Sequence, residues 1–259
     1  MSPADARIRG AFLFCDRLIL EARTRTISRL LPAATDDVTM AVTPKLITAF
    51  ATPFFEANLD NPAALNDMLK NLFIEREREG DKYRNPHMTP GKVGLFESDF
   101  DLFRWPDEPV KELRGFCMDA IGQVIANLNG YTPADLSRLE IINHTWFHIT
   151  RKGGYTTYHN HPMASWSGVY CVDPGDPPDE KSDSGILRFL DPRGMANMFL
   201  DAGNTRLQQP FKVASLNFRL TPGRFIIFPS YLYHEVAPYQ GDGTRITVAI
   251  NSWVRERAR

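Results

Sequence analysis

Three histidines are the residues whose spacing most favours chemistry. His159 and His161 stand two apart in the stretch YHNHPM, and His234 follows later in PSYLYHEVAPY. Side chains two apart on a β-strand project from the same face, so His159 and His161 are expected to reach one point while Tyr158 faces the other way. Imidazole is the commonest metal ligand among side chains, and the pattern predicts a metal site of His159, His161 and His234.

The other histidines serve as a contrast. A single histidine is more often a hydrogen-bonded structural residue than a metal ligand. His144 and His148 share a strand face with Trp146, but no further motif follows them, and we interpret both as structural or pocket-lining. His87 is expected in a surface loop.

A polar strand face follows the third histidine. In RITVAINSWV, alternation places Arg245, Thr247 and Asn251 on one face and the aliphatic residues on the other. An inward arginine beside a hydroxyl suits a dicarboxylate, which the guanidinium binds through two parallel hydrogen bonds. The alternative is a structural ion pair of Arg245 with Asp191 or Glu235.

Composition limits the class of protein. The chain has 259 residues, 43% hydrophobic and 24% charged, which is enough for a sizeable core. A formal net charge of −1 gives no basic surface for nucleic acid or anionic membranes. The apolar run AFLF is interrupted by Cys15, Asp16 and Arg17, so neither a signal peptide nor a membrane span is expected. Cys15, Cys117 and Cys171 form no metal-type pair and are expected to be buried, reduced thiols of a cytoplasmic protein.

Two periodicities predict the elements that must position the site. Helical spacing runs over about residues 60–128, with an Asn61-Pro62 start for one helix and an Asn129-Gly130 stop for a second. From about residue 139 the period becomes two, and short strands are expected in the segments LEIINHTWFHI, WSGVYCV, GILRFL, SLNFRL, GRFIIF and RITVAINSWV. Helices followed by strands predict an α+β protein whose second half forms a jelly roll, with packing helices from the first half.

The predicted domain organisation is simple. Residues 1–42 are interpreted as an N-terminal extension and residues 43–259 as a single domain. Its helical part covers about 43–130 and its jelly-roll part about 139–255. The polar, proline-rich segment DPGDPPDEKSDSG, residues 173–185, is expected to be an exposed loop between two strands.

The ordered motifs resemble a known family. His-x-His, a distal histidine and then Arg-x-Thr look like the Fe(II)- and 2-oxoglutarate-dependent oxygenases, which have a double-stranded β-helix fold. More closely, the segments HNHP, SGVY, DPR, FPSYLYHEV and RITVAIN are similar to an uncharacterised bacterial branch of 2OG-Fe(II) oxygenases. The resemblance covers roughly residues 45–254.

The resemblance implies roles for individual residues. His159 would be the first iron ligand, His161 would take the place usually held by a carboxylate, and His234 would be the distal ligand. Arg245 and Thr247 would bind the distal carboxylate of the cosubstrate 2-oxoglutarate. Further contacts to cosubstrate or substrate are expected from Asn143, Asn251, Tyr158, Trp166, Arg193 and Tyr231. The implied reaction is O2-dependent hydroxylation of a small molecule with release of succinate and CO2.

A third histidine in place of the carboxylate leaves alternatives open. Zinc, copper or nickel also suits three imidazoles. His161 would otherwise swing away and leave its place to water or a carboxylate such as Asp191. A cupin-like three-histidine enzyme that does not use 2-oxoglutarate, and a non-catalytic jelly roll that binds a metal or ligand, remain as competing functions. The prime substrate and the oligomeric state are open, a homodimer being one option.

Overall fold

The computed structural model describes residues 43–259, except residues 88–90, 177–178, 180 and 258–259. The predicted extension 1–42, with Cys15, lies outside the described residues. Residues 43–50 contain neither helix nor strand, and Ala51–Arg259 form one compact unit. The helices of this unit are α3 (Ala63–Arg78), α4 (Glu108–Asn129) and α5 (Pro133–Ser137), and its strands are β1 (Phe55–Asn58), β2 (Lys92–Glu97), β3 (Leu139–His159), β4 (Trp166–Asp173), β5 (Leu187–Phe189), β6 (Leu216–Phe218), β7 (Arg224–Pro229), β8 (His234–Val236) and β9 (Arg245–Glu256).

The strands form one curled antiparallel sheet in the order β1-β7-β4-β9-β3-β8-β5-β6, with β2 added beside β3. The long strand β3 joins the two halves of the curl. Residues 139–150 pair with β9, whereas Thr156 and His159 pair with β8. The result is a double-stranded β-helix, and the expected α+β class with a jelly-roll core is confirmed. Because β3 changes partners along its length, its far end lies next to β8, which begins at His234.

Side chains along β9 alternate between the hydrophobic core and a pocket on the other face of the sheet. Ile246, Val248 and Ile250 are buried in the main hydrophobic cluster. Arg245 and Thr247, which point the other way, line a pocket on the opposite side of the sheet. One strand thus anchors itself by its apolar face and presents its polar face to a ligand.

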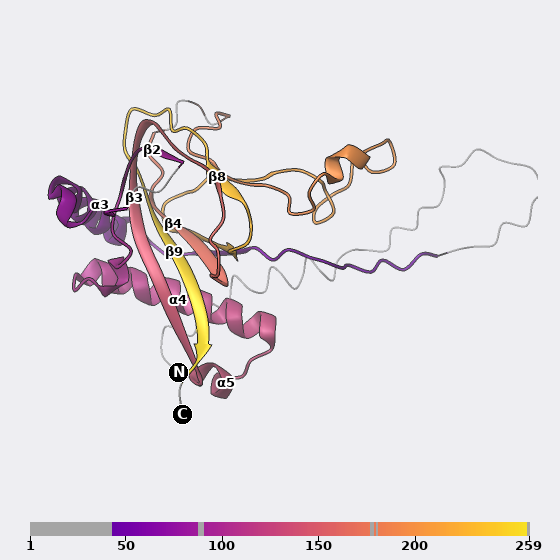
Figure 1. Ribbon diagram of the computed structural model, residues 1–259, viewed down its shortest axis with the longest axis horizontal. Coiled ribbons are helices and arrows are strands. Elements are labelled where there is room, and N and C mark those ends of the chain that lie inside the picture. Colours follow the sequence, from indigo (N-terminus) through magenta and orange to yellow (C-terminus); the bar gives the residue numbers. More distant parts are fainter. Residues whose placement is uncertain (1–42, 88–90, 177–178, 180, 258–259) are drawn as a thin grey trace, which may run out of the picture. The chain divides into compact units, whose positions relative to one another are not determined.

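Helices α3 and α4 cover the apolar side of the sheet, and Figure 1 shows them along one side of β3, β9 and β4. The predicted stop of the second helix is confirmed, because Gly130 adopts φ 66°, a left-handed conformation that ends a helix without steric cost. Cys117 on α4 and Cys171 on β4 are free and buried, as expected. Met68 of α3 and Leu128 of α4 are apolar but 48% and 47% exposed.

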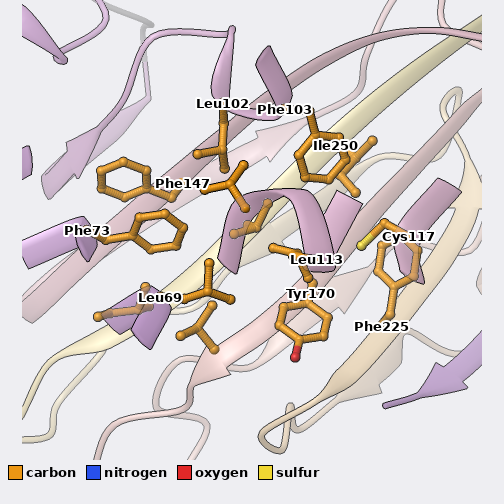
Figure 2. Close-up of a cluster of buried hydrophobic side chains, with 14 of the residues drawn as sticks. Leu69, Phe73, Leu102, Phe103, Leu113, Cys117, Phe147, Tyr170, Phe225 and Ile250 are labelled. Carbon is orange, nitrogen blue, oxygen red and sulfur yellow. The ribbon is translucent and has the colours of Figure 1, made fainter. Parts of the chain in front are cut away.

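The core is dominated by aromatic rings between helix and sheet. Figure 2 shows Phe73 of α3 facing Phe147 of β3, with Leu69 and Leu113 nearby. The rings of Phe73 and Phe147 are stacked with centroids 4.2 Å apart, and both side chains are fully buried. This contact attaches α3 to the strand that carries the site.

We expect Phe147→Ala to destabilise the protein by about 3–5 kcal/mol, since it leaves a cavity among fully buried rings. Chemical denaturation measures the effect. The matched control is Phe199→Ala, because Phe199 is 77% exposed and its loss should change the free energy of unfolding by less than about 0.5 kcal/mol. Equal effects of the two substitutions would contradict the assigned core.

Several features of the fold differ from the sequence pattern. Strands β1 and β2 were not expected, because both are short; β1 lies just before the stretch of helical periodicity and β2 within it. The segment 173–185 does connect β4 to β5, as predicted. Within the described residues, no helix combines the length and the apolar character needed to cross a bilayer.

Candidate functional site

The structure brings His159, His161 and His234 together. One potential ligand atom from each lies within 4.8 Å of the others, a spacing that one metal ion can bridge. The ring centroids of His159 and His234 are 4.3 Å apart, and those of His161 lie 5.0 and 5.1 Å from them. His159 ends β3, and His234 begins β8 as its register partner. His161 lies two residues beyond the end of β3, so its approach depends on the turn and not on strand alternation.

Backbone carbonyls fix the tautomers of two of these rings. The Nδ1 atom of His159 donates to the Thr157 carbonyl at 2.8 Å, and that of His234 donates to the Leu232 carbonyl at 2.9 Å. A carbonyl only accepts, so each Nδ1 carries the proton and each Nε2 keeps its lone pair. Metal-binding histidines are typically oriented by such a hydrogen bond on the second nitrogen.

The third ring is held by an amide. Asn251 lies 3.0 Å from His161 Nδ1, and its oxygen accepts a hydrogen bond from the Ser167 hydroxyl at 2.7 Å. Ser230 continues this chain, 2.7 Å from Ser167, and its carbonyl accepts from the His161 backbone N–H. Turning the amide by 180° lets its oxygen accept the Nδ1 proton and its NH2 group donate to Ser167, the arrangement that ligation through Nε2 requires. The network therefore supports His161 as a ligand.

Asn251→Leu removes both hydrogen bonds of this amide. We expect metal affinity to fall by about 10–100-fold, the usual cost of losing the group that orients a ligand. Titration of the apo-protein with a divalent metal measures the change. Asn143→Leu is the matched control, because Asn143 bonds Met118 and Ser252 and not a histidine of the cluster. An unchanged affinity in Asn251→Leu would contradict the orienting role.

Burial keeps the cluster neutral. It lowers the pKa of His161 to about 2 and that of His234 to about 3, and the neighbouring imidazoles add to both shifts. Burial likewise lowers the pKa of His159. At neutral pH all three rings are uncharged, so their free nitrogens can bind a cation without competition from protons.

Arg245 is a buried cation that forms no ion pair with any carboxylate of the described residues. Its side chain is 3% exposed, and its Nη2 atom has no hydrogen-bond partner in the described part of the chain. Both carboxylates suggested as structural partners are bound elsewhere, since Asp191 pairs with Arg193 and Glu235 with Arg188. An unpaired buried guanidinium costs several kcal/mol in a folded protein, on general grounds, unless a ligand supplies the negative charge. Asp191 also lies outside the histidine cluster and does not complete it.

Arg245 and the three histidines line one pocket. Thr247 follows Arg245 on the same strand face, buried and open to the pocket. Gly185 packs against the Arg245 side chain, and a Cβ there would lie 3.1 Å from its Cδ atom. The remaining wall is largely apolar and includes Val169, Leu187, Phe228 and Val236. The candidate metal ligands and the candidate anion-binding residues thus line one pocket.

Lys92 was missed by the sequence analysis. It comes from β2, pairs in register with Thr156, and lines the same pocket. Its ammonium group contacts Glu97 and lies 5.6 Å from the centre of the Trp146 ring. Glu97 also lies 2.8 Å from His148 Nε2. No sequence motif marks Lys92 as a pocket residue, because strand β2 itself was not predicted. Its place next to the apolar residues of this short segment was the available indication. His148 lines the pocket, within the interpretation given to it.

Other predicted contacts lie away from the pocket. Asn143 points to α4, where it bonds Met118. Trp166 packs in the core against Phe55. The last three, Tyr158, Arg193 and Tyr231, are exposed and do not line the pocket; Arg193 bonds the carbonyls of Phe211 and Lys212 in addition to Asp191. On the strands, adjacent positions alternate faces, which turns Tyr158 outward and Trp166 into the core; Arg193 and Tyr231 lie in exposed segments between strands.

Comparison with known proteins agrees with this geometry. Residues 144–251 match the family model described as "Putative 2OG-Fe(II) oxygenase". The matched range begins on β3 and ends on β9, and it contains the three histidines, Arg245 and Thr247. No curated protein matches the sequence.

Solved structures show the same fold. A prolyl-4-hydroxylase of Pseudomonas putida is 18% identical over 80% of this chain and 94% of that chain, with a TM-score of 0.52. A prolyl hydroxylase of Trichoplax adhaerens is 12% identical over 77% and 83%, with a TM-score of 0.51. The epimerase SnoN, solved with Fe3+, alpha ketoglutarate and nogalamycin RO, is 11% identical over 80% and 82%, with a TM-score of 0.52. Residues 144–251 thus match the sequence pattern of the 2OG-Fe(II) oxygenases, and the chain shares the fold of these solved structures.

Proposed function

We propose that this protein is a non-haem Fe(II)- and 2-oxoglutarate-dependent dioxygenase that hydroxylates a small molecule and releases succinate and CO2. The observation that carries the proposal is the combination, in one pocket, of three neutral imidazoles with a buried arginine that lacks a counter-ion among the described residues. A metal alone would satisfy the histidines but leave Arg245 unpaired. The activity is assigned to residues 43–259 as one domain, with 1–42 as an N-terminal extension.

The donor set fits both groups. Three imidazole nitrogens suit Fe(II), and a guanidinium with a neighbouring hydroxyl suits a carboxylate. In this assignment His159, His161 and His234 hold the metal, and Arg245 with Thr247 binds the distal carboxylate of 2-oxoglutarate. SnoN offers support, because its structure holds iron and alpha ketoglutarate within a similar fold.

The chain's own residues contribute positioning and exclusion of water. Thr157 and Leu232 orient two histidines through their carbonyls, and Asn251 orients the third. Phe228 and Phe189 pack on His234, with ring centroids 4.9 and 5.4 Å away, and close the apolar side of the site. When bound, iron and 2-oxoglutarate supply the oxidising chemistry of this enzyme class. The protein itself holds the cosubstrate and the target carbon in fixed positions and keeps water out.

The test begins with the apo-protein under anaerobic conditions. Fe(II) and then 2-oxoglutarate are added while the visible spectrum is recorded. The expected result is the charge-transfer band of a 2-oxo acid bound to iron through two oxygens. Succinate release that depends on both additions, after admission of O2, then demonstrates turnover. Iron binding without the band would favour a three-histidine metalloenzyme of the cupin type, or a non-catalytic metal-binding jelly roll, over this proposal.

His161→Asp tests whether the third histidine occupies a ligand position. We expect iron affinity to stay within about tenfold of the wild-type value, because carboxylate oxygen and imidazole nitrogen both bind Fe(II). His161→Leu, which offers no ligand atom, should lose far more. Metal content after dialysis measures both variants. If the Asp and Leu variants lose iron equally, His161 does not occupy a ligand position that accepts a carboxylate.

A further inference from the structure

Lys92 is a second buried cation of the pocket, and the assignment above leaves it unused. Its side chain is 11% exposed, and its ammonium group contacts Glu97 and faces Trp146. Among the described residues, Glu97 accepts a hydrogen bond from one of the three N–H donors of Lys92. Burial lowers the pKa of Lys92 to about 8, while the Glu97 carboxylate beside it favours the charged form.

Lys92 lies close to the metal-binding histidines. Its positive charge contributes to the lowered pKa values of His159 and His161. Trp146, which Lys92 faces, lies with its ring centroid 6.0 Å from that of His161. One oxygen of the Glu97 carboxylate contacts Lys92, and its other oxygen accepts a hydrogen bond from the Asn85 side-chain amide. Lys92 lines the same pocket as the three histidines, so its ammonium group lies near the space in which a substrate would approach the metal.

The charges of the loaded pocket do not cancel. Neutral histidines leave both positive charges of Fe(II) in place, whereas a ligand set with one carboxylate would cancel one of them. Arg245 adds a positive charge, and Lys92 and Glu97 neutralise each other. The 2-oxoglutarate dianion compensates for two of these charges, so one positive charge remains in a pocket with little water. Such a charge strongly favours an anion over a neutral or cationic ligand.

We propose that the prime substrate is a carboxylate-bearing small molecule and that Lys92 is the specificity-determining residue that binds its carboxylate beside the metal. This inference rests on the proposed function and names its substrate class. In this assignment the guanidinium of Arg245 binds the carboxylate of the cosubstrate, and the ammonium group of Lys92 binds the carboxylate of the substrate.

The test measures binding without turnover. Nickel replaces iron, and the affinity for 2-oxoglutarate is measured first by calorimetry. A panel of matched pairs, each a carboxylic acid and its carboxamide, is then screened on the nickel and 2-oxoglutarate complex by thermal shift, and the best acids are titrated. The acids should bind about tenfold or more tightly than their amides. This preference should persist in Lys92→Arg and be markedly smaller in Lys92→Met, where only the part due to the residual charge of the pocket remains.

Two further variants guard the interpretation. The double variant Lys92→Met, Glu97→Gln avoids leaving the Glu97 carboxylate buried without its lysine, and its acid preference should be reduced as in the single variant. Lys152→Met is the matched control, because Lys152 is exposed, pairs with Asp242, and should retain the preference. Absence of an acid preference in the wild type, or its undiminished persistence in both Lys92→Met variants, would overturn the inference. If 2-oxoglutarate binds normally in either case, the proposed function stands. If 2-oxoglutarate does not bind, the proposed function fails, and the screen on the nickel complex alone still decides whether Lys92 selects acids.

Discussion

His234→Ala is expected to abolish stable metal binding. The imidazole is 3% exposed, and its Nε2 atom is freed for ligation by the hydrogen bond from Nδ1 to the Leu232 carbonyl. Its removal should weaken metal affinity by more than about 100-fold, beyond the 10–100-fold typical of losing a group that only orients a ligand. Equilibrium dialysis against Fe(II) or Ni(II), followed by metal analysis, measures the loss.

The control for this variant is His87→Ala. His87 is exposed and lies outside the histidine cluster, so its removal should leave metal affinity unchanged. Circular dichroism of His234→Ala checks that the fold persists without the ring, which also packs on Phe228. Full metal affinity in a folded His234→Ala protein would exclude His234 as a ligand and, with it, the proposed three-histidine site.

Arg245→Met is expected to remove 2-oxoglutarate binding and to spare the metal. The cation is buried and forms no ion pair with the described residues, so a bound carboxylate forms a desolvated, charge-assisted pair with it. Losing one partner of such a pair costs on the order of 2–5 kcal/mol, or more than about 30-fold in affinity. Calorimetric titration of 2-oxoglutarate into the nickel-loaded protein measures the change, with a nickel titration in parallel.

Two other arginine variants sharpen this test. Arg245→Lys keeps the charge but loses the planar fork, so its affinity for 2-oxoglutarate should lie between those of the wild type and Arg245→Met. Arg151→Met is the control, because Arg151 is exposed and pairs with Glu77 on α3, away from the pocket. An unchanged cosubstrate affinity in Arg245→Met would show that Arg245 is not the cosubstrate's anchor. The ligand of its buried charge would then have to be another anion.

The distinction between the two large effects is informative in itself. Loss of 2-oxoglutarate binding with the metal retained is possible because the two sites are built on different elements. The histidines come from the end of β3 and the start of β8, whereas Arg245 opens β9. A substitution at one end of the pocket therefore need not disturb the other, and non-additive losses in a double variant would reveal direct coupling.

Local patterns determined much of this protein. The period-two alternation in RITVAINSWV fixed which side chains of β9 face the pocket, and the helical period and Gly130 fixed the extent of α4. The spacing of His159 and His161, with His234 further along the chain, indicated the three residues of the histidine cluster, although the turn after β3 and not strand alternation brings His161 to the others. The jelly-roll core followed from the number and spacing of the strands.

Only the tertiary structure decided the rest. Lys92 enters the pocket because the short strand β2 pairs with β3, a contact between segments about sixty residues apart that no periodicity reports. Asn251 reaches His161 only because β9 lies between β3 and β4 in the sheet. Asp191 and Glu235, which a sequence allows as partners of Arg245, are taken by other arginines. Which partner a buried charge finds depends on how distant strands are placed, and a one-dimensional pattern does not contain that information.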